Sequence, residues 1–415
     1  MSERLIVVLI ALLMGAQPIA TDLYLPALPT LTTHLGASMA QGQLTLTAML
    51  LAFGLSQLIW GPISDRFGRK PVLLAGLSVY TLAAIASSLA NDINTLIACR
   101  VAQGASMGAG VMCARAIVRD MYLPVQGARV ASKAYSVLGL LIGVTMPVGA
   151  VMAQWWGWRI PFVAVAVFGA SSLFVVATRY TESLKSPNPR ALEPQTLLRT
   201  WRSILTNPVF LAFTCLTVTT YCGLFTFLAA SSFVFLQILK MSPAEYGLWM
   251  CTMVFFYVPG TFLCRSLLQK YGVRRTIAIG GAISLTGGTL MALLAWWGFV
   301  HPLALMGPFW IYMVGHGIHQ ACGQSGAVGP FPQAAGAASA MNGFLMMAVA
   351  FCIGLWLGRN LGDSVQPMAY GVWFWSVLLV LTAWTLIQRH GASATPGPAA
   401  DIAVPAPLGA ARVET

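Results

Sequence analysis

Apolar segments long enough to cross a membrane recur along the whole chain, separated by short polar stretches. A helix needs about 20 mainly apolar residues to cross the hydrocarbon core of a bilayer. Twelve such helices are predicted, at residues 5–27, 43–63, 71–90, 95–118, 131–153, 159–178, 208–236, 245–268, 274–297, 303–328, 335–358 and 368–388. The first is interpreted as an uncleaved spanning helix rather than a signal peptide, because its apolar run continues to Leu25.

The spacing of these helices predicts an all-α membrane protein built from two six-helix, pseudo-symmetric halves. The expected divisions are an N-terminal half, a basic cytoplasmic linker, a C-terminal half and a disordered cytoplasmic tail, at residues 1–178, 179–206, 207–390 and 391–415. Each half has a short basic loop after its second helix, at residues 61–70 in the first half and 265–275 in the second. Repeated halves place a substrate site in a central cavity near the midplane.

Composition supports the membrane class. Hydrophobic residues make up 58% of the 415 residues, charged residues make up 8%, and the mean hydropathy is +0.77. A soluble protein of this length could not cover so much apolar surface. All eight cysteines lie in apolar segments without a CxxC pair, so no disulfide framework is expected.

The net charge of +12 is explained by membrane orientation rather than by nucleic acid. With the N-terminus inside, eighteen of the 23 basic residues fall on the cytoplasmic side. Only Arg159, Lys240 and Arg359 fall outside. Because basic residues concentrate in cytoplasmic loops, both termini are predicted to lie in the cytoplasm of a bacterial inner membrane.

Four motifs carry a family resemblance. They are Asp22-Leu-Tyr-Leu-Pro-Ala-Leu-Pro29, Gly61-Pro-Ile-Ser-Asp65-Arg66-Phe-Gly68-Arg69-Lys70, Arg100-Val-Ala-Gln103-Gly104 and Arg115-Ala-Ile-Val-Arg119-Asp120-Met-Tyr122. Together they resemble the bicyclomycin-resistance (Bcr/CflA) group of drug:proton antiporters in the major facilitator superfamily, and residues 181–184 and 336–340 also fit. The resemblance implies a transporter, not an enzyme, that exports drugs or small amphiphilic molecules in exchange for protons by alternating access.

The fifth helix departs from the family pattern. Antiporters of this kind usually carry a Gly/Pro-rich run that ends in Pro-x-x-Gly-Gly, whereas Gly139, Gly143, Pro147 and Gly149 keep the composition without the spacing. A bend and close packing are still expected at residues 143, 147 and 149, because Gly allows near contact and Pro removes a backbone hydrogen bond.

Asp22 is the candidate for proton coupling. It alone among the eleven acidic residues lies within an apolar run. A charged side chain at the centre of a bilayer costs about 2.5–3.5 kcal/mol on insertion scales, so Asp22 should face a cavity or a partner. The alternative is that Asp22 caps the turn that follows it.

Arg100 is the candidate partner of Asp22. It lies about five residues into the inward-running fourth helix, at a depth similar to that of Asp22 in the outer half of the first. The resemblance implies that helices one, four, seven and ten line the cavity, so Arg100 can alternately pair with Asp22 and release it. The alternative is a lone arginine held by backbone carbonyls.

A cytoplasmic gate is implied by the loop motif, whose charged residues latch helix ends together in related proteins. Arg115 and Arg119 lie near the inner end of helix four, within possible reach of Asp65. The expected gate residues are Gly61, Asp65, Arg66, Gly68, Arg69, Arg115, Arg119 and Asp120. The alternative is that these charges only set the topology.

The tenth helix carries His316 and His319, which are three residues apart and share a helix face. They can bind substrate or relay protons. The alternatives are a packed, hydrogen-bonded pair or, with Cys322, a metal site, which the absence of an HExxH motif disfavours. The predicted cavity lining is Tyr24, Gln103, Tyr221, Phe225, His316, His319 and Gln320.

Other functions remain open at this point. The imidazoles and amides of helix ten favour a dedicated exporter or proton symporter of one polar metabolite, while an intramembrane metal-dependent enzyme lacks a placed carboxylate. The expected partners are a small-molecule substrate, protons and the lipid bilayer, with no nucleic acid, cofactor or resident metal, and the chain is expected to be a monomer. The substrate itself is not determined.

Overall fold

The computed structural model describes residues 2–122, 124–184, 186–362 and 364–391. Over these residues the chain consists of helices and irregular connections, without β-strands; the connection from α7 to α8 is much longer than a turn. The all-α prediction is therefore confirmed. The predicted disordered tail lies outside the described residues, apart from Gly391.

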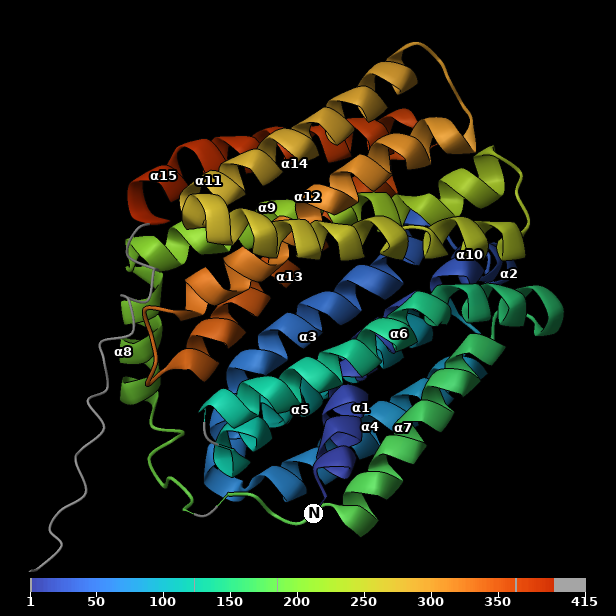
Figure 1. Ribbon diagram of the computed structural model, residues 1–415. Helices are drawn as coiled ribbons and strands as arrows, with labels where there is room; N and C mark the ends of the chain where they lie inside the picture. Colours follow the sequence, from blue (N-terminus) through green and yellow to red (C-terminus); the bar gives the residue numbers. More distant parts are fainter. Residues whose placement is uncertain (1, 123, 185, 363, 392–415) are drawn as a thin grey trace, which may run out of the picture.

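The helices form two groups that meet along the middle of the molecule (Figure 1). The first group contains α1 (Glu3–Asp22), η1 (Leu25–Ala27), α2 (Leu28–His34), α3 (Met39–Phe67), α4 (Arg69–Leu89), α5 (Ile93–Met121), α6 (Pro124–Trp156) and α7 (Ile160–Arg179). The second contains α9 (Pro208–Phe233), η2 (Val234–Ile238), α10 (Pro243–Cys251), α11 (Val254–Trp296), α12 (Pro302–Val328), α13 (Ala335–Asn360), α14 (Gln366–Trp384) and α15 (Leu386–His390).

The number of spans agrees with the twelve predicted. Ten described segments are long and apolar enough to cross a bilayer. One of them, Pro243–Trp296, is 54 residues long and contains both the 245–268 and the 274–297 prediction. The helix predicted at 303–328 corresponds to α12 (Pro302–Val328), which is 27 residues long.

The loop predicted around residues 265–275 is wrong in its extent. Helical structure continues from Val254 to Trp296, and the only non-helical backbone reported within it is at Gly272, with φ 71° and ψ 177°. A positive φ is easily adopted by glycine because it lacks a Cβ. A single glycine therefore redirects the chain where a longer loop was expected.

The linker also holds an element that the sequence reading missed. Residues Pro194–Leu205 form α8, which lies across the ends of the long helices (Figure 1). Pro194 at its first position suits a helix start because proline has no N–H to leave unsatisfied. Its buried residue, Ile204, joins the apolar cluster around α9, and the helix contacts α13.

Helix one is interrupted just after Asp22. α1 ends there, a short 3-10 helix follows at Leu25–Ala27, and α2 resumes at Leu28. Pro26 and Pro29 each lack a backbone N–H, so a continuous α-helical hydrogen-bond ladder cannot pass through this stretch. The interruption places Asp22 at a helix end, where local backbone is irregular.

The two halves pack along α3 and α13, and again along α6 and α10. Small residues make this possible. Gly54 on α3 lies against Met347, and Gly354 on α13 lies against Thr47. Glycines at these positions let the backbones approach closely, as is typical of helix contacts in membranes.

Candidate functional site

Asp22 lies at the end of α1, partly exposed among buried neighbours. Thr21 Oγ1 donates a hydrogen bond of 2.8 Å to Asp22 Oδ1. The starting residues of η1 and α2 receive no side-chain capping bond, so Asp22 does not cap the following turn here.

Arg100 is fully buried on α5. Its Nη1 donates to Gln103 Oε1 at 2.5 Å, and its Nη2 donates to the Ala20 carbonyl at 2.8 Å. Within the described residues it forms no ion pair with Asp22, whose backbone is two residues from that carbonyl. The guanidinium is thus held by one amide and one backbone carbonyl in this conformation.

Aromatic rings complete the surroundings of Arg100. Its guanidinium carbon lies 4.2 Å from the ring centroid of Tyr24 and 5.6 Å from that of Phe162. The Tyr24 hydroxyl lies 3.1 Å from Thr45 Oγ1. Cation–π contact stabilises a cation that has been removed from water. Phe162 and Thr45 were not singled out by the sequence, because neither belongs to a motif.

Two donors next to this cation lack partners. Arg100 Nε and Gln103 Nε2 are buried without a hydrogen-bond partner among the described residues. A buried donor without an acceptor costs about 1–3 kcal/mol. Both donors are therefore available to a further acceptor, such as a carboxylate.

Of the cavity-lining residues predicted in the second half, some lie close together in the structure. Tyr221 and Phe225 stack on one face of α9, with ring centroids 6.2 Å apart. His316 Nδ1 on α12 lies 3.0 Å from Thr220 Oγ1, and its ring faces Tyr257 at 5.8 Å. Aromatic rings and hydroxyls from α9, α11 and α12 therefore meet around His316.

His319 faces a different helix from His316, although the two share one side of α12. Its Nε2 donates to the Ile277 carbonyl of α11 at 3.2 Å, and its Nδ1 has no partner among the described residues. Gly280 makes room for the ring. Gln320 Oε1 is likewise buried without a partner. No group of three or more His, Cys, Asp or Glu side chains suited to a metal ion occurs in the described chain.

At the other end of the first half, Arg69 is the centre of the loop motif. Its side chain is only 2% exposed. Nη1 lies 2.5 Å from Asp65 Oδ1, and Nε lies 3.0 Å from Asp120 Oδ2, so one guanidinium joins the ends of α3 and α5. Ser64 Oγ accepts a further bond of 2.7 Å from Nη1. Arg66 is exposed beside the Phe67 ring.

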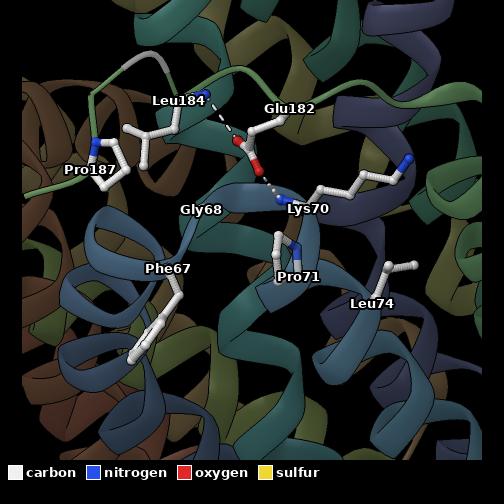
Figure 2. A pocket seen from close by; sticks show the side chains of 8 residues that line it. All are labelled: Phe67, Gly68, Lys70, Pro71, Leu74, Glu182, Leu184 and Pro187. Atoms are coloured by element: carbon white, nitrogen blue, oxygen red, sulfur yellow. Dashed lines mark hydrogen bonds between the residues drawn. The ribbon is translucent and has the colours of Figure 1, made fainter.

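Glu182, which follows α7 in the chain, caps the N-terminus of α4. Its carboxylate accepts hydrogen bonds from the backbone N–H groups of Arg69, Lys70 and Leu184, at 3.1, 2.8 and 2.9 Å. Figure 2 shows the bonds from Lys70 and Leu184. Partial burial acts to raise the pKa of Glu182, but these N–H groups outweigh it and hold the pKa below 4.5. Gly68, with φ 101°, precedes the helix in a conformation that favours glycine.

Arg115 contacts the second half instead of Asp65. Its Nη1 donates to Ser339 Oγ of α13 at 2.6 Å. Asp65 is engaged by Arg69, so the expected contact between Asp65 and Arg115 is not formed. Arg119 also points toward α13, with Nη1 close to Gly336.

Ser339 also belongs to a polar hydrogen-bond network that was not predicted from the sequence. Gln324 Nε2 donates to Ser339 Oγ at 2.9 Å, Asn342 Nδ2 donates to Gln324 Oε1 at 2.9 Å, and Thr217 Oγ1 donates to Asn342 Oδ1 at 2.7 Å. The network links α12, α13 and α9 to Arg115. Uncharged polar residues in an apolar helix were the only signal for it.

The residues expected to bend the fifth helix mediate close contacts. α6 runs as one helix through Pro147. Gly149 packs directly on the Leu23 carbonyl, next to Asp22. The Gly143 carbonyl accepts a hydrogen bond from Cys251 Sγ at 3.3 Å, and Gly247 lies against Pro147. The predicted close packing of this helix is present.

Gly61 on α3, one of the predicted gate residues, has only ordinary van der Waals contact with Met112.

Comparison with known proteins gives one family. Residues 10–355 match the model of the Major Facilitator Superfamily. Multidrug resistance protein D of Escherichia coli is 27% identical over 82% of this chain and 85% of its own length. The bicyclomycin resistance protein homolog of Haemophilus influenzae is 25% identical over 94% and 98%. The chloramphenicol resistance protein of Pseudomonas aeruginosa is 26% identical over 88% and 85%.

The fold is also found among solved structures. The D-xylose-proton symporter superposes with a TM-score of 0.70 over 93% of this chain and 97% of that one, at 15% identity. A partially occluded inward-open form of a xylose transporter from E. coli gives 0.70 at 14% identity. At such low identity the likeness establishes the architecture of two helical halves and nothing finer.

Proposed function

Because the chain belongs to the major facilitator superfamily, we propose that this transporter exports drugs or small amphiphilic molecules in exchange for protons. The observation that carries the proposal is Asp22, a partly exposed carboxyl group at the interruption of helix one, between the two halves. Relatives named for multidrug, bicyclomycin and chloramphenicol resistance support this substrate class and placement in the Bcr/CflA group.

Proton coupling would work through the charge of Asp22. When Asp22 loses its proton, the carboxylate needs a donor, and Arg100 Nε and Gln103 Nε2 are both unoccupied. When Asp22 is protonated, Arg100 returns to the Ala20 carbonyl and Gln103 contacts. Asp22 and Ala20 belong to α1, whereas Arg100 and Gln103 belong to α5. Proton uptake by Asp22 would therefore change the contacts that hold these two helices together.

The latch around Arg69 would work at the cytoplasmic end. The bonds of Arg69 to Asp65 and Asp120 hold α3, α4 and α5 as one unit. Arg115 and Ser339 join this unit to α13. Opening toward the cytoplasm then requires the contact between halves to break while the contacts within the first half remain, which is the pattern expected for two halves that rock about a central site.

The substrate would contact Tyr24, Tyr221, Phe225, His316 and Gln320 between the halves. Stacked rings suit amphiphilic drugs of varied shape, because binding pockets are mostly apolar with few polar groups. The pairing of His316 with Thr220 favours a second candidate, an exporter or symporter of one polar metabolite. His319 is assigned to helix packing on this proposal, since it faces Ile277.

The orientation proposed for the chain follows from its charges. With both termini in the cytoplasm of a bacterial inner membrane, the latch and α8 lie on the cytoplasmic side, where most basic residues fall. Asp22 then lies toward the outer side, where protons enter an exchanger driven by an inward gradient. The chain would act as a monomer, because the site is formed within one copy.

The test is transport into inverted membrane vesicles energised with a pH gradient, with a panel that includes bicyclomycin, chloramphenicol and polar metabolites. Wild-type protein should accumulate a drug only while the gradient persists, and addition of a proton ionophore should release it. Asp22→Asn should abolish gradient-driven uptake, because an amide cannot exchange a proton. Downhill exchange of the same drug should survive in this variant.

Asp92→Asn is the matched control. Asp92 is an exposed acid that caps α5 through Thr95, away from the proposed site. It should retain gradient-driven transport. The proposal fails if Asp22→Asn, at normal expression, transports with wild-type rate and pH dependence. Uptake of a single polar metabolite, with no drug transported, would support the second candidate instead.

A further inference from the structure

Two buried cysteines touch in the second half, one turn beyond His319 on α12. Cys264 of α11 and Cys322 of α12 have their sulfur atoms 3.5 Å apart. Cys264 Sγ also lies 3.7 Å from the Ile318 carbonyl. The two residues are 3% and 6% exposed and belong to an apolar cluster that includes Phe213, Ile277 and Ile318. They form a pair of thiols in a dry environment.

The close approach of the two sulfurs has a structural cause. One turn before Cys264, Gly260 lies directly against the Val314 carbonyl of α12, and Gly317 lies against the backbone of α11 near Tyr257. A Cβ at either glycine would collide with backbone atoms. The glycines therefore let the two helix axes approach closely. The two cysteines lie about one turn further along the same pair of helices. The pair is held by rigid helices.

The donor set of this pair limits what it can bind. Within the described chain, no third Cys, His, Asp or Glu joins the two thiols in a metal-ligand group. Zinc generally takes four ligands, so this pair would leave it incomplete. Soft thiolates select soft cations, and two sulfurs are enough for a cation that binds two ligands in line.

Charge balance further limits which cation the two thiolates can bind. Loss of both thiol protons leaves two negative charges, and a monovalent soft ion such as silver would leave one of them uncompensated. A net charge buried in apolar surroundings is costly. A divalent soft ion gives a neutral complex. The mercuric ion combines divalency, softness and a preference for two sulfur ligands.

We propose that Cys264 and Cys322 form a binding site for a divalent, thiophilic cation of the mercuric type, which bridges α11 and α12. Two S–H bonds break and two Hg–S bonds form, two protons leave, and no atom is oxidised or reduced. The sulfurs must separate by about 1 Å to admit the ion between them, since metal–sulfur bonds are near 2.3 Å. The bridge would fix α11 against α12.

The experiment uses the purified full-length chain in detergent. One equivalent of mercuric chloride is added, the sample is passed through a desalting column that contains an excess of a small monothiol, and bound mercury is measured by mass spectrometry. Wild-type protein should retain one mercury per chain. Cys264→Ser and Cys322→Ser should each retain on the order of a hundredfold less, because loss of one thiol removes the effective concentration of the second ligand.

Cys113→Ser and Cys222→Ser are matched controls, since each removes a buried cysteine outside the pair. Both should retain mercury as the wild type does. X-ray absorption at the mercury edge should show two sulfur neighbours in the wild type. Should either pair variant fail to fold, the corresponding alanine variant replaces it. Equal retention by pair and control variants, or none by the wild type, would overturn the proposal. None of these readouts depends on transport.

Discussion

The most informative single residue is Arg100, a cation that is buried completely and has no carboxylate partner among the described residues. Burial of an isolated charge is costly unless other groups replace the water it has lost. Here the Gln103 amide, the Ala20 carbonyl and the Tyr24 ring share that task. These contacts approach the guanidinium from different directions, so the planar, forked shape of arginine matters as much as its charge.

Arg100→Lys keeps the charge and tests this geometry. A single ammonium group cannot replace all three contacts, so we expect the free energy of unfolding to fall by about 1–3 kcal/mol. Gradient-driven transport should fall about tenfold or more, which corresponds to about 1.4 kcal/mol. Thermal unfolding in detergent and vesicle transport measure the two effects.

The control for that substitution is Arg359→Lys, at an exposed position in the last turn of α13. It should leave both measurements within error of the wild type. If Arg100→Lys also leaves stability and transport unchanged, the three guanidinium contacts do not stabilise the protein as proposed. The charge alone would then account for its presence.

At the scale of an element, the start of α4 shows how a distant residue completes a helix. The first N–H groups of a helix have no partner within it, and an anion placed there is stabilised by the helix dipole. Glu182 supplies that anion from the linker, more than a hundred residues further along the chain. The linker is thereby tied to the loop that carries Asp65 and Arg69.

Glu182→Gln should reduce stability by about 1 kcal/mol at neutral pH, as loss of a helix cap does. The folded pKa of Glu182 lies below its ordinary 4.5, so its stabilisation is fully present above 4.5 and is lost as the pH falls through the folded pKa. The difference in unfolding temperature between variant and wild type should therefore shrink as the pH is lowered from about 7 to about 3.

Glu193→Gln provides the comparison for the Glu182 prediction. It removes the same charge from the same linker, but Glu193 is exposed, and among the described residues its carboxylate accepts only from the Thr196 side chain. This variant should unfold near the wild-type temperature at neutral pH. A pH-independent effect of Glu182→Gln would mean that the capping charge is not the cause.

The glycines of α6 give a second test at the element scale. A methyl group at Gly149 would collide with the Leu23 carbonyl, whereas one at Gly139, on the same helix, would meet nothing within 4 Å. Gly149→Ala should cost on the order of 1–3 kcal/mol. Gly139→Ala should be neutral or stabilising by up to about 1 kcal/mol, because alanine favours helix. Thermal unfolding compares them, and equal effects would contradict the close packing.

For the whole molecule, the important contacts are those that join the halves. At one end Arg115 donates to Ser339, and at the other Gln43 donates to the Ala229 carbonyl at 2.5 Å. Between them, α3 and α13 pack through small residues such as Gly54 and Gly354. Polar contacts at the two ends and a close-packed middle are suited to two halves that rock about a central line.

Arg115→Ala should shift the equilibrium between the conformations of the two halves toward the form that is open at the end where Arg115 meets Ser339. Loss of a hydrogen bond from a charged group is worth about 1.5–3 kcal/mol, so the population ratio should change about tenfold or more. Spin labels at exposed positions 129 and 275, in a background without reactive cysteines, would report this as a gain in longer distances.

Ser325→Ala is the control for the Arg115 prediction. Within the part of the chain that the structure describes, its hydroxyl bonds only to carbonyls of its own helix, one residue after Gln324, which contacts Ser339. The distance distribution should not change in this variant. An unchanged distribution in Arg115→Ala would show that the Arg115–Ser339 contact does not hold the halves together.

Much of the architecture was determined by the sequence alone. Hydrophobic length fixed the spans, because the hydrocarbon core sets how many apolar residues a helix needs. Asp22 and the loop motif could be found because a charge in an apolar run, or a Gly-Asp-Arg pattern between two such runs, is visible without coordinates. α8 was missed, since a short amphipathic helix in a basic, proline-containing linker gives no spanning signal.

Only the tertiary structure decided which side chains meet. His316 and His319 occupy one side of α12, yet they bond to α9 and α11 respectively. Arg115 bonds to Ser339 rather than to Asp65, and Cys264 touches Cys322 across 58 residues. The physical reason is that helix periodicity fixes a direction around one axis, whereas a contact also depends on how close the neighbouring axis lies, and here glycines set that distance.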